Sequence, residues 1–402
     1  METSAFIKIR GLIRATTGGM TIGGLLVFLA SCVTAPEQSE PEHLVWPSPP
    51  LTTRIEFVRS IVSDEDLGRD TTYTQRLLNF LAGEKPHPNR IVEPMGLAVS
   101  DDGQRLYVSD FAHLAVFVFD LAQKKFTKIG AQENLARPVG IALDAQEQLY
   151  VVEQEKKGIS VFDRQGKKIQ FITHPGIERP TGIALDRARG KIYLADTGHT
   201  RSPTHDVKIF NLRGELVGAI GQGKGSGPGQ FLFPTYLAVD PQGNLYVTDT
   251  LNSRVQVFDA DGKYLKTVGS RGSAWGMFDK PKGVALDSFG NLYVADSGWS
   301  NVQIFNQKGQ VLLFFGGRGP IPGMLKNPTA ITIDKQNRIY VADYLNHRVE
   351  VYQLVNTTAT DSFLSPPVAE RGGDAELKDN SDVKQQAVVG NTDKSRLEFE
   401  RR

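Results

Sequence analysis

The stretch 234–269 reads PTYLAVDPQGNLYVTDTLNSRVQVFDADGKYLKTVG and predicts four short β-strands. Branched and aromatic residues fill the runs 237–239, 244–248, 254–258 and 264–268. Gly, Asp, Asn and Pro separate these runs, as expected for tight turns between antiparallel strands. The stretch therefore predicts one small four-stranded antiparallel sheet.

The chain repeats this pattern six times. A proline precedes each first strand, at intervals of 44, 42, 54, 47 and 47 residues. The prolines are Pro94, Pro138, Pro180, Pro234, Pro281 and Pro328. An acid ends each second strand: Asp110, Glu153, Asp196, Asp249, Asp296 and Asp343. A single sheet of this size cannot bury both its faces, so the copies must stack, and six twisted sheets close into a ring. We expect an all-β, six-bladed β-propeller with four-stranded antiparallel blades.

Ring closure is predicted from the two ends of the repeat region. The last copy reaches only its third strand, over 348–352, before the pattern stops. Ahead of the first copy, residues 53–62 alternate between apolar and polar side chains like a strand. We expect Ile55–Ile61 to supply the missing outer strand of the last blade and so to close the ring.

The last copy resembles an NHL repeat. It reads YVADYLNHRVEVY over 340–352 and contains the namesake residues Asn346, His347 and Arg348. The fourth copy has the same pattern at 249–254, whereas the fifth departs from it at Trp299 and the first three depart further. The resemblance covers about 55–354 and implies the propeller fold. It leaves function open, because the family includes enzymes, RNA binders and protein-binding scaffolds.

The N-terminus carries the only cysteine of the chain, Cys32. A basic segment with Lys8 and Arg10 precedes an apolar run at 20–30, which is too short to span a bilayer. Small residues immediately before a cysteine resemble a bacterial lipobox, which implies cleavage before Cys32 and its lipidation. An ordinary signal peptide or a short anchor is the alternative. By resemblance to Gram-negative lipoproteins, Val33 after the cysteine favours the outer membrane over the inner one.

These features predict four segments. Residues 1–31 are expected to be a lipoprotein signal peptide, 32–50 a Pro-rich tether, 51–355 the propeller and 356–402 a disordered polar tail. Residues 63–90 do not fit the repeat. They contain a predicted amphipathic helix at 71–83, either a plug on the rim of the ring or a gate over its channel.

Composition narrows the function classes. The net charge of +1 gives no global field that would attract nucleic acid, so RNA binding is not expected. A single cysteine excludes an intrachain disulfide framework and a Cys-based zinc site.

One face of the ring is predicted to carry the function. The loops from strand two to strand three, and from strand four to the next blade, emerge together there; they are long and variable, and we call this the variable face. Its candidate partner-binding residues are Arg254, Arg348, His347, Asn346, Asn252, Trp275, Trp299 and Arg201. Exposed Trp beside Arg is typical of binding hot spots. The alternatives are hydrogen bonding between blades for the polar residues and packing beneath their own loops for the tryptophans.

This face also contains candidate metal ligands and a glycine-rich stretch. Four residues are candidate metal ligands: His199, His205, Asp206 and His113. A solvated loop at 197–206 is the alternative, and the six strand-ending acids are interpreted as turn caps or partners of the repeat arginine. The glycine-rich stretch 218–225 lacks the Ser or Thr of a phosphate loop and recurs twice, which favours a blade connector.

The function predicted from sequence is a non-catalytic, monomeric scaffold that needs no cofactor. It would bind an envelope protein, a peptide or a glycan at the bacterial cell envelope, anchored through Cys32. The alternative is a metal-dependent propeller enzyme, a lyase or lactonase-like hydrolase with its site over the central channel, as the resemblance implies for some relatives.

Overall fold

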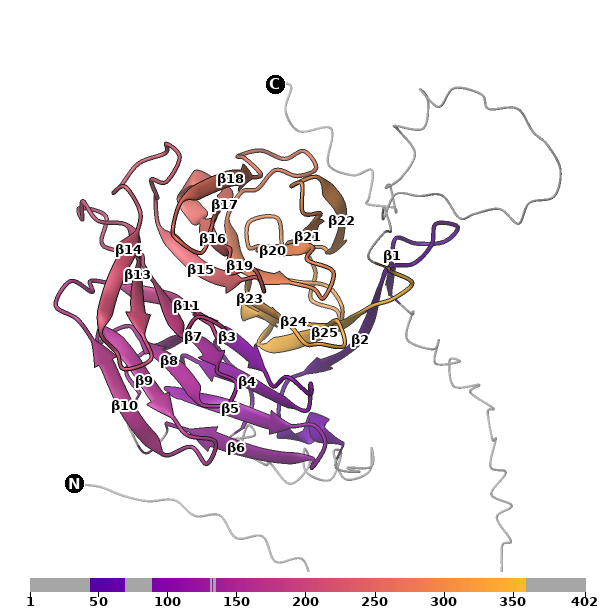
Figure 1. Ribbon diagram of the computed structural model, residues 1–402. Helices are drawn as coiled ribbons and strands as arrows, with labels where there is room; N and C mark the ends of the chain where they lie inside the picture. Colours follow the sequence, from indigo (N-terminus) through magenta and orange to yellow (C-terminus); the bar gives the residue numbers. More distant parts are fainter. Residues whose placement is uncertain (1–43, 69–88, 131, 133–134, 359–402) are drawn as a thin grey trace, which may run out of the picture. The chain divides into compact units, whose positions relative to one another are not determined.

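Six antiparallel sheets stand around one axis, so the predicted six-bladed propeller is confirmed (Figure 1). The computed structural model describes residues 44–68, 89–130, 132 and 135–358. The predicted signal peptide, the predicted helix at 71–83 and the tail beyond residue 358 lie outside the described residues. Within the described part of the chain, no helix has the length and apolar character needed to cross a membrane.

Each blade runs from an inner first strand to an outer fourth strand. Blades one to three contain β3 (Pro94–Val99), β4 (Arg105–Asp110), β5 (Ala115–Asp120) and β6 (Lys125–Ile129); β7 (Pro138–Leu143), β8 (Leu149–Glu153), β9 (Gly158–Phe162) and β10 (Lys168–Thr173); β11 (Pro180–Asp186), β12 (Lys191–Asp196), β13 (Asp206–Asn211) and β14 (Leu216–Ile220). Blades four to six contain β15 (Pro234–Val239), β16 (Leu245–Asp249), β17 (Arg254–Phe258) and β18 (Tyr264–Val268); β19 (Pro281–Leu286), β20 (Leu292–Asp296), β21 (Asn301–Phe305) and β22 (Val311–Gly316); β23 (Pro328–Ile333), β24 (Arg338–Asp343), β25 (Arg348–Leu354), β2 (Ile55–Ile61) and β1 (Val45–Trp46). Three short 3-10 helices complete the elements: η1 (Asp64–Leu67), η2 (Thr250–Asn252) and η3 (Tyr344–Asn346).

The first strands surround the axis of the propeller and contact one another in sequence around the ring (Figure 1). Four blades place a glycine at the third residue of this strand because neighbouring backbones approach closely there. A Cβ on Gly96 would lie 2.3 Å from the carbonyl oxygen of Val139, and one on Gly182 would lie 2.2 Å from that of Thr235. Blade four carries Tyr236 instead, which changes the channel as described below.

The hydrophobic core is divided into six clusters, each lying between two neighbouring blades. The second and third strands are buried on both faces, and the fourth strands are the most exposed. This burial explains why the runs are continuous apolar stretches, and why one repeat alone would leave a face uncovered.

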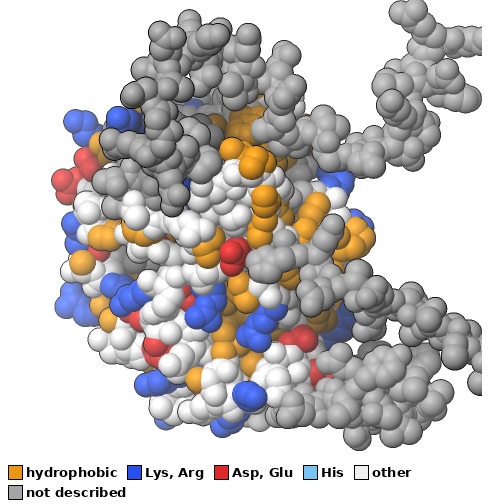
Figure 2. Space-filling view, turned by 90° about the vertical axis from the view of Figure 1, so that its right-hand side faces the viewer, with side chains coloured by type: hydrophobic (Ala, Val, Ile, Leu, Met, Phe, Trp, Pro, Cys, Tyr) orange, Lys and Arg blue, Asp and Glu red, His pale blue; other side chains and the backbone are white. Residues whose placement is uncertain are grey.

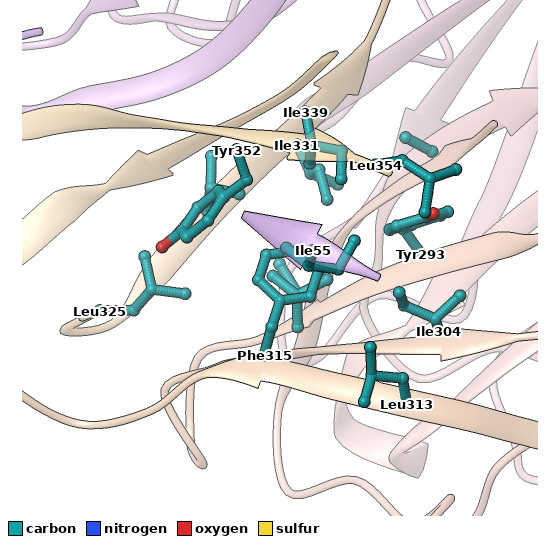
Figure 3. Packing of buried hydrophobic residues seen from close by; sticks show 14 of the residues in the cluster. Ile55, Tyr293, Ile304, Leu313, Phe315, Leu325, Ile331, Ile339, Tyr352 and Leu354 are labelled. Carbon is teal, nitrogen blue, oxygen red and sulfur yellow. The ribbon is translucent and has the colours of Figure 1, made fainter. Parts of the chain in front are cut away.

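Strand β2 closes the ring, as predicted. It pairs antiparallel with β25, with Ile55 opposite Leu354 and Ile61 opposite Val349. Figure 3 shows Ile55 among side chains of blades five and six, including Phe315 and Tyr352. Strand β1 then pairs with β2 and lies within the stretch 32–50 that sequence predicts to be a tether. The sixth blade is therefore built from both ends of the propeller region.

Surface charge is mixed on the side of the molecule that Figure 2 shows. Lys and Arg side chains there are interspersed with Asp and Glu and with apolar side chains. The described residues on this side present no continuous basic surface of the kind that nucleic-acid binding requires.

Candidate functional site

The six strand-ending acids hold the loops of the variable face in place. All are buried, and each accepts a hydrogen bond from backbone amides just before the first strand of its own blade. Asp196, for example, accepts from the amides of Glu178 at 2.8 Å and Arg179 at 2.7 Å. A carboxylate already saturated by amides has a structural role, which agrees with the capping interpretation.

The repeat arginines fasten the glycine-rich connectors. The Arg254 guanidinium pairs with Asp249 at 2.9 Å and donates to the carbonyl oxygens of Ser226, Gly227 and Gln230. Arg348 makes the equivalent bonds in blade six, two repeats later, to the carbonyl oxygens of Pro320, Ile321 and Met324. Only 12% and 9% of the two side chains is exposed. Little of either guanidinium is therefore left for a partner.

Asn252 and Asn346 bind the same connectors. Their side-chain amides donate to the carbonyl oxygens of Gly225 and Gly319, respectively. Each amide also donates to the strand-ending acid of its blade. His347 and Arg201 differ, because both side chains are exposed. The His347 ring contacts the carbonyl oxygen of Val92 and so joins blade six to the segment before blade one.

Exposed apolar side chains gather on the variable face of blades four to six. We call this group the apolar rim: Leu251, Trp275, Trp299, Ile321 and Leu345. The side chains of Trp275 and Trp299 are 54% and 42% exposed. Their loops are tied together, because the Trp299 indole N–H donates to the carbonyl oxygen of Gly272 at 3.1 Å. The Trp275 ring packs edge-on against Phe314 with 4.9 Å between centroids.

The candidate metal ligands are not brought together as one group. His205 is fully buried and its Nδ1 accepts the backbone N–H of Phe233 at 3.0 Å, so this nitrogen is already occupied. Asp206 accepts a bond from Lys208 at 3.0 Å. His113 lies on blade one against Asp110, whereas His199 is on the exposed loop of blade three. Among the described residues, no group of three His, Cys, Asp or Glu side chains has the arrangement of a metal site.

The mouth of the channel on the variable face is a cavity of about 410 Å³, which we call the upper chamber. Its lining comes from the start of the first strands, from the residues before them and from the residues after the strand-ending acids. The lining residues are Met95, Phe111, Arg137, Val139, Gln154, Arg179, Thr181, Thr235, Tyr236, Lys282, Thr329 and Tyr344.

The threonine hydroxyls of this chamber are used to join blades. The Thr181 hydroxyl donates to the carbonyl oxygen of Thr235 at 3.1 Å, and that of Thr329 donates to Pro94 at 2.8 Å. These bonds link β11 to β15 and β23 to β3, and they leave the two hydroxyls little capacity for a ligand.

Three cations line the upper chamber. The Arg137 guanidinium stacks over the Phe111 ring at 4.5 Å. Arg179 has no side-chain hydrogen bond or ion pair within the described residues. Lys282 lies across the ring on blade five, and its one side-chain hydrogen bond to a described residue is a long contact of 3.4 Å from Nζ to the amide oxygen of Asn327. Burial, with a smaller contribution from Lys280, lowers the pKa of Lys282 to about 8.

Tyr236 is the floor of the upper chamber. Its side chain crosses the channel from blade four, and its hydroxyl donates to the carbonyl oxygen of Met95 on blade one at 2.8 Å. Tyr236 also lines a second cavity of about 280 Å³ toward the opposite face, whose other lining is mainly Ala, Val, Leu and Ile. The channel is therefore divided into two chambers by one side chain.

Sequence reasoning did not identify the upper chamber. Its cations lie at register positions that the repeat itself defines. Arg137 and Arg179 immediately precede the repeat prolines, and Lys282 immediately follows one. An alignment of the six copies at these two positions would have shown the charged residues at the channel mouth.

Two family models match the chain. The model described as the SMP-30/Gluconolactonase/LRE-like region matches residues 77–215. The NHL repeat model matches 231–258 and 325–352, which are the fourth and sixth copies of the pattern.

Curated relatives share part of this chain. Protein brain tumor of Drosophila melanogaster is 29% identical over 151 residues, covering 36% of this chain and 14% of that protein. Antigen Lp49 of Leptospira interrogans is 25% identical over 190 residues, covering 43% of this chain and 40% of that protein. The chain thus spans less than half the length of either relative.

Among solved structures, a gluconolactonase from Xanthomonas campestris has a TM-score of 0.52 at 18% identity, covering 74% of this chain and 98% of that chain. A likeness at this identity shows the fold alone.

Proposed function

We propose that this chain, an NHL-repeat six-bladed β-propeller, is a non-catalytic scaffold that binds another protein on its variable face. The apolar rim is the observation that carries the proposal. It places two half-exposed tryptophans and three exposed aliphatic side chains on one face of three consecutive blades. Large exposed apolar groups that gather on one face are typical of protein-binding surfaces, and Trp is enriched among their strongest contacts.

The rim is held rigidly, which favours binding. Arg271 donates to the carbonyl oxygen of Leu251, and Arg318 donates to that of Gly298, so each connector is fastened to the loop beside it. Arg348 fixes the connector that contains Arg318, through the carbonyl oxygens of Pro320, Ile321 and Met324. Loops that are already ordered lose little conformational entropy when a partner binds.

The proposal includes a lipid anchor at Cys32, and with it a place at the bacterial cell envelope, most consistent with the outer membrane. It is supported by the basic segment, the short apolar run and the small residues before Cys32. If it is correct, Cys32→Ala will move the protein from the membrane fraction to the soluble fraction. A Cys32→Ala protein that stays in the membrane fraction would contradict the lipid anchor.

Site-specific photo-crosslinking tests the binding face. A photoreactive phenylalanine analogue replaces Trp275 in the full-length protein, in its native membranes. We expect one envelope protein to be crosslinked and the yield to fall when Trp299→Ala is added. The matched control places the analogue at Leu212, an exposed apolar residue in the turn after β13 on the opposite face. Equal crosslinking at both positions, or none at position 275, would rule out the rim as the partner site.

A metal-dependent propeller enzyme is the second candidate function. The match of residues 77–215 to the gluconolactonase-type model favours it, together with the chambers on the propeller axis. It predicts near-stoichiometric divalent metal in purified protein and a lower thermal midpoint after chelation. Metal-free protein whose midpoint is unchanged by chelator would exclude it.

A further inference from the structure

We infer that the upper chamber binds the carboxylate of a small organic acid or of a peptide C-terminus, held by Arg137, Arg179 and Lys282. This site lies on the axis of the ring, whereas the apolar rim lies on the loops of blades four to six. The inference does not rest on the proposed scaffold function.

The three cations approach one cavity from different blades. Arg137 and Arg179 come from the neighbouring blades two and three, and Lys282 comes from blade five. A group bound between them is held from several directions by a rigid ring. Guanidinium groups bind carboxylates through paired N–H donors, and an ammonium adds a third charged contact.

Carboxylates of the protein do not balance this charge inside the chamber. Among the described residues that line it there is no Asp or Glu. Glu155 lies 3.6 Å from Arg137, but its side chain is 60% exposed and that of Arg137 is 45% exposed, so the pair is on the solvent side and weak. Glu93 hydrogen-bonds Tyr344, which lines the chamber, but Glu93 is not itself part of the lining.

Burial of the Lys282 ammonium without a carboxylate partner among the described residues destabilises its charged form, and a bound anion would remove this destabilisation. A partly buried ammonium without a carboxylate partner is disfavoured, which is why its pKa lies near 8. A binding site is where such an unmatched charge is expected, because the ligand supplies the opposite charge.

The lining also indicates the rest of the ligand. Met95, Phe111 and Val139 surround the cations with apolar surface, which suits an organic acid better than inorganic phosphate. The chamber of about 410 Å³ is at the small end of ligand pockets, and Tyr236 closes it below. An acid head with a short apolar body therefore fits, whereas a ligand that passes through the ring does not.

Isothermal titration of the full chain in detergent tests the inference with two pairs of probes. One pair is 3-phenylpropionate and 3-phenylpropionamide, and the other is the tripeptide Ala-Ala-Phe as free acid and as amide. We expect each acid to bind at least about tenfold more tightly than its amide. Tighter binding of the tripeptide acid would identify a polypeptide end as the source, and tighter binding of phenylpropionate would identify a free acid.

Variants and phosphate complete the test. Lys282→Met and, separately, Arg179→Gln should each weaken acid binding about tenfold, whereas the matched Lys263→Met, in an exposed turn of the opposite face, should not. The inference is overturned if acids and amides bind alike, if neither chamber variant weakens binding, or if inorganic phosphate binds more tightly than both acids. Absence of binding by either acid up to about 20 mM would also overturn it, because it would put the Kd beyond the millimolar range.

Discussion

At the scale of single residues, the charged side chains of this propeller are of two kinds. Some donate all or most of their hydrogen bonds to the protein's own loops, and others keep donors that a ligand can use. Arg254 and Arg348 have the sequence context of exposed contacts, yet each donates to three loop carbonyl oxygens. Among the residues that the structure describes, Lys282 and Arg179 have no comparable set of partners. The capacity of a side chain to bind a ligand depends on which of its hydrogen-bonding groups the protein has already used.

The first prediction concerns Lys282. Its folded pKa of about 8 lies below its usual value, so the charged form opposes folding whenever the unfolded chain is protonated. The resulting loss of folding stability has its full size below about pH 8. It disappears as the pH rises toward the unfolded pKa of 10.5. Lys282→Met should therefore raise the thermal midpoint at pH 7 and raise it less at pH 9.5.

The control for this measurement is a lysine that lies away from the charged groups around Lys282. Lys280, Arg137, Arg179, Tyr236 and Tyr344 are the titratable groups around it on the chamber side. Lys263→Met, outside the chamber, should leave the midpoint unchanged at both pH values. An equal gain for Lys282→Met at pH 7 and pH 9.5 would show that packing, and not charge burial, causes the change.

At the scale of elements, the sixth blade decides whether the ring is closed. Its outer strands β2 and β1 come from the N-terminal side of the propeller, and its inner strands β23, β24 and β25 from the C-terminal side. Ile55 of β2 is fully buried between blades five and six, beside Phe315 and Tyr352 (Figure 3). Closure is therefore stabilised by side-chain packing between blades as well as by the main-chain ladder.

The second prediction tests this closure with two substitutions on one strand. Ile55→Ala should lower the free energy of unfolding by about 2–5 kcal/mol, because it leaves a cavity in a packed core. Val58→Ala, at a half-exposed position of the same strand, should change it by no more than about 0.5 kcal/mol. Denaturant titration of both variants gives the comparison. Similar values for the two would mean that β2 contributes only its backbone to closure.

At the scale of the whole molecule, one side chain connects opposite parts of the ring. Tyr236 reaches from blade four to the carbonyl oxygen of Met95 on blade one, and it separates the upper chamber from the lower one. Desolvation of its buried hydroxyl raises the pKa of Tyr236 well above the usual value, so the group stays protonated and donates.

The third prediction is that Tyr236→Phe destabilises the ring. The carbonyl oxygen of Met95 would lose its partner inside the channel, which costs about 1–3 kcal/mol. Tyr264→Phe on the outer strand β18 is the matched control, because that hydroxyl is bound to Thr267 at the surface and its loss should be nearly neutral. Chemical denaturation of the two variants measures the difference. Equal midpoints would show that water or another group satisfies Met95 without Tyr236.

Much of the architecture is encoded locally and could be predicted. Strand alternation, the recurring prolines and the strand-ending acids specify six similar sheets, and the unpaired run Ile55–Ile61 specifies how the last one is completed. These features depend on periodicity and on turn-forming residues, which act over a few positions of the chain. The recurring glycine-rich stretches are connectors between blades, as the sequence predicts, and each has the same short parallel bridge.

The candidate site depends on which residues the closed ring brings together, whereas the sequence shows only where these residues stand in each repeat. Tyr236 meets Met95 across 141 positions of the chain, and Arg137, Arg179 and Lys282 share one cavity although they belong to three repeats. Only the folded ring shows that Arg254 and Arg348 are occupied by loops, that the described candidate ligands form no group of three, and that the tryptophans remain exposed. The physical reason is that hydrogen-bond saturation and burial are properties of neighbours in space, and ring closure chooses those neighbours.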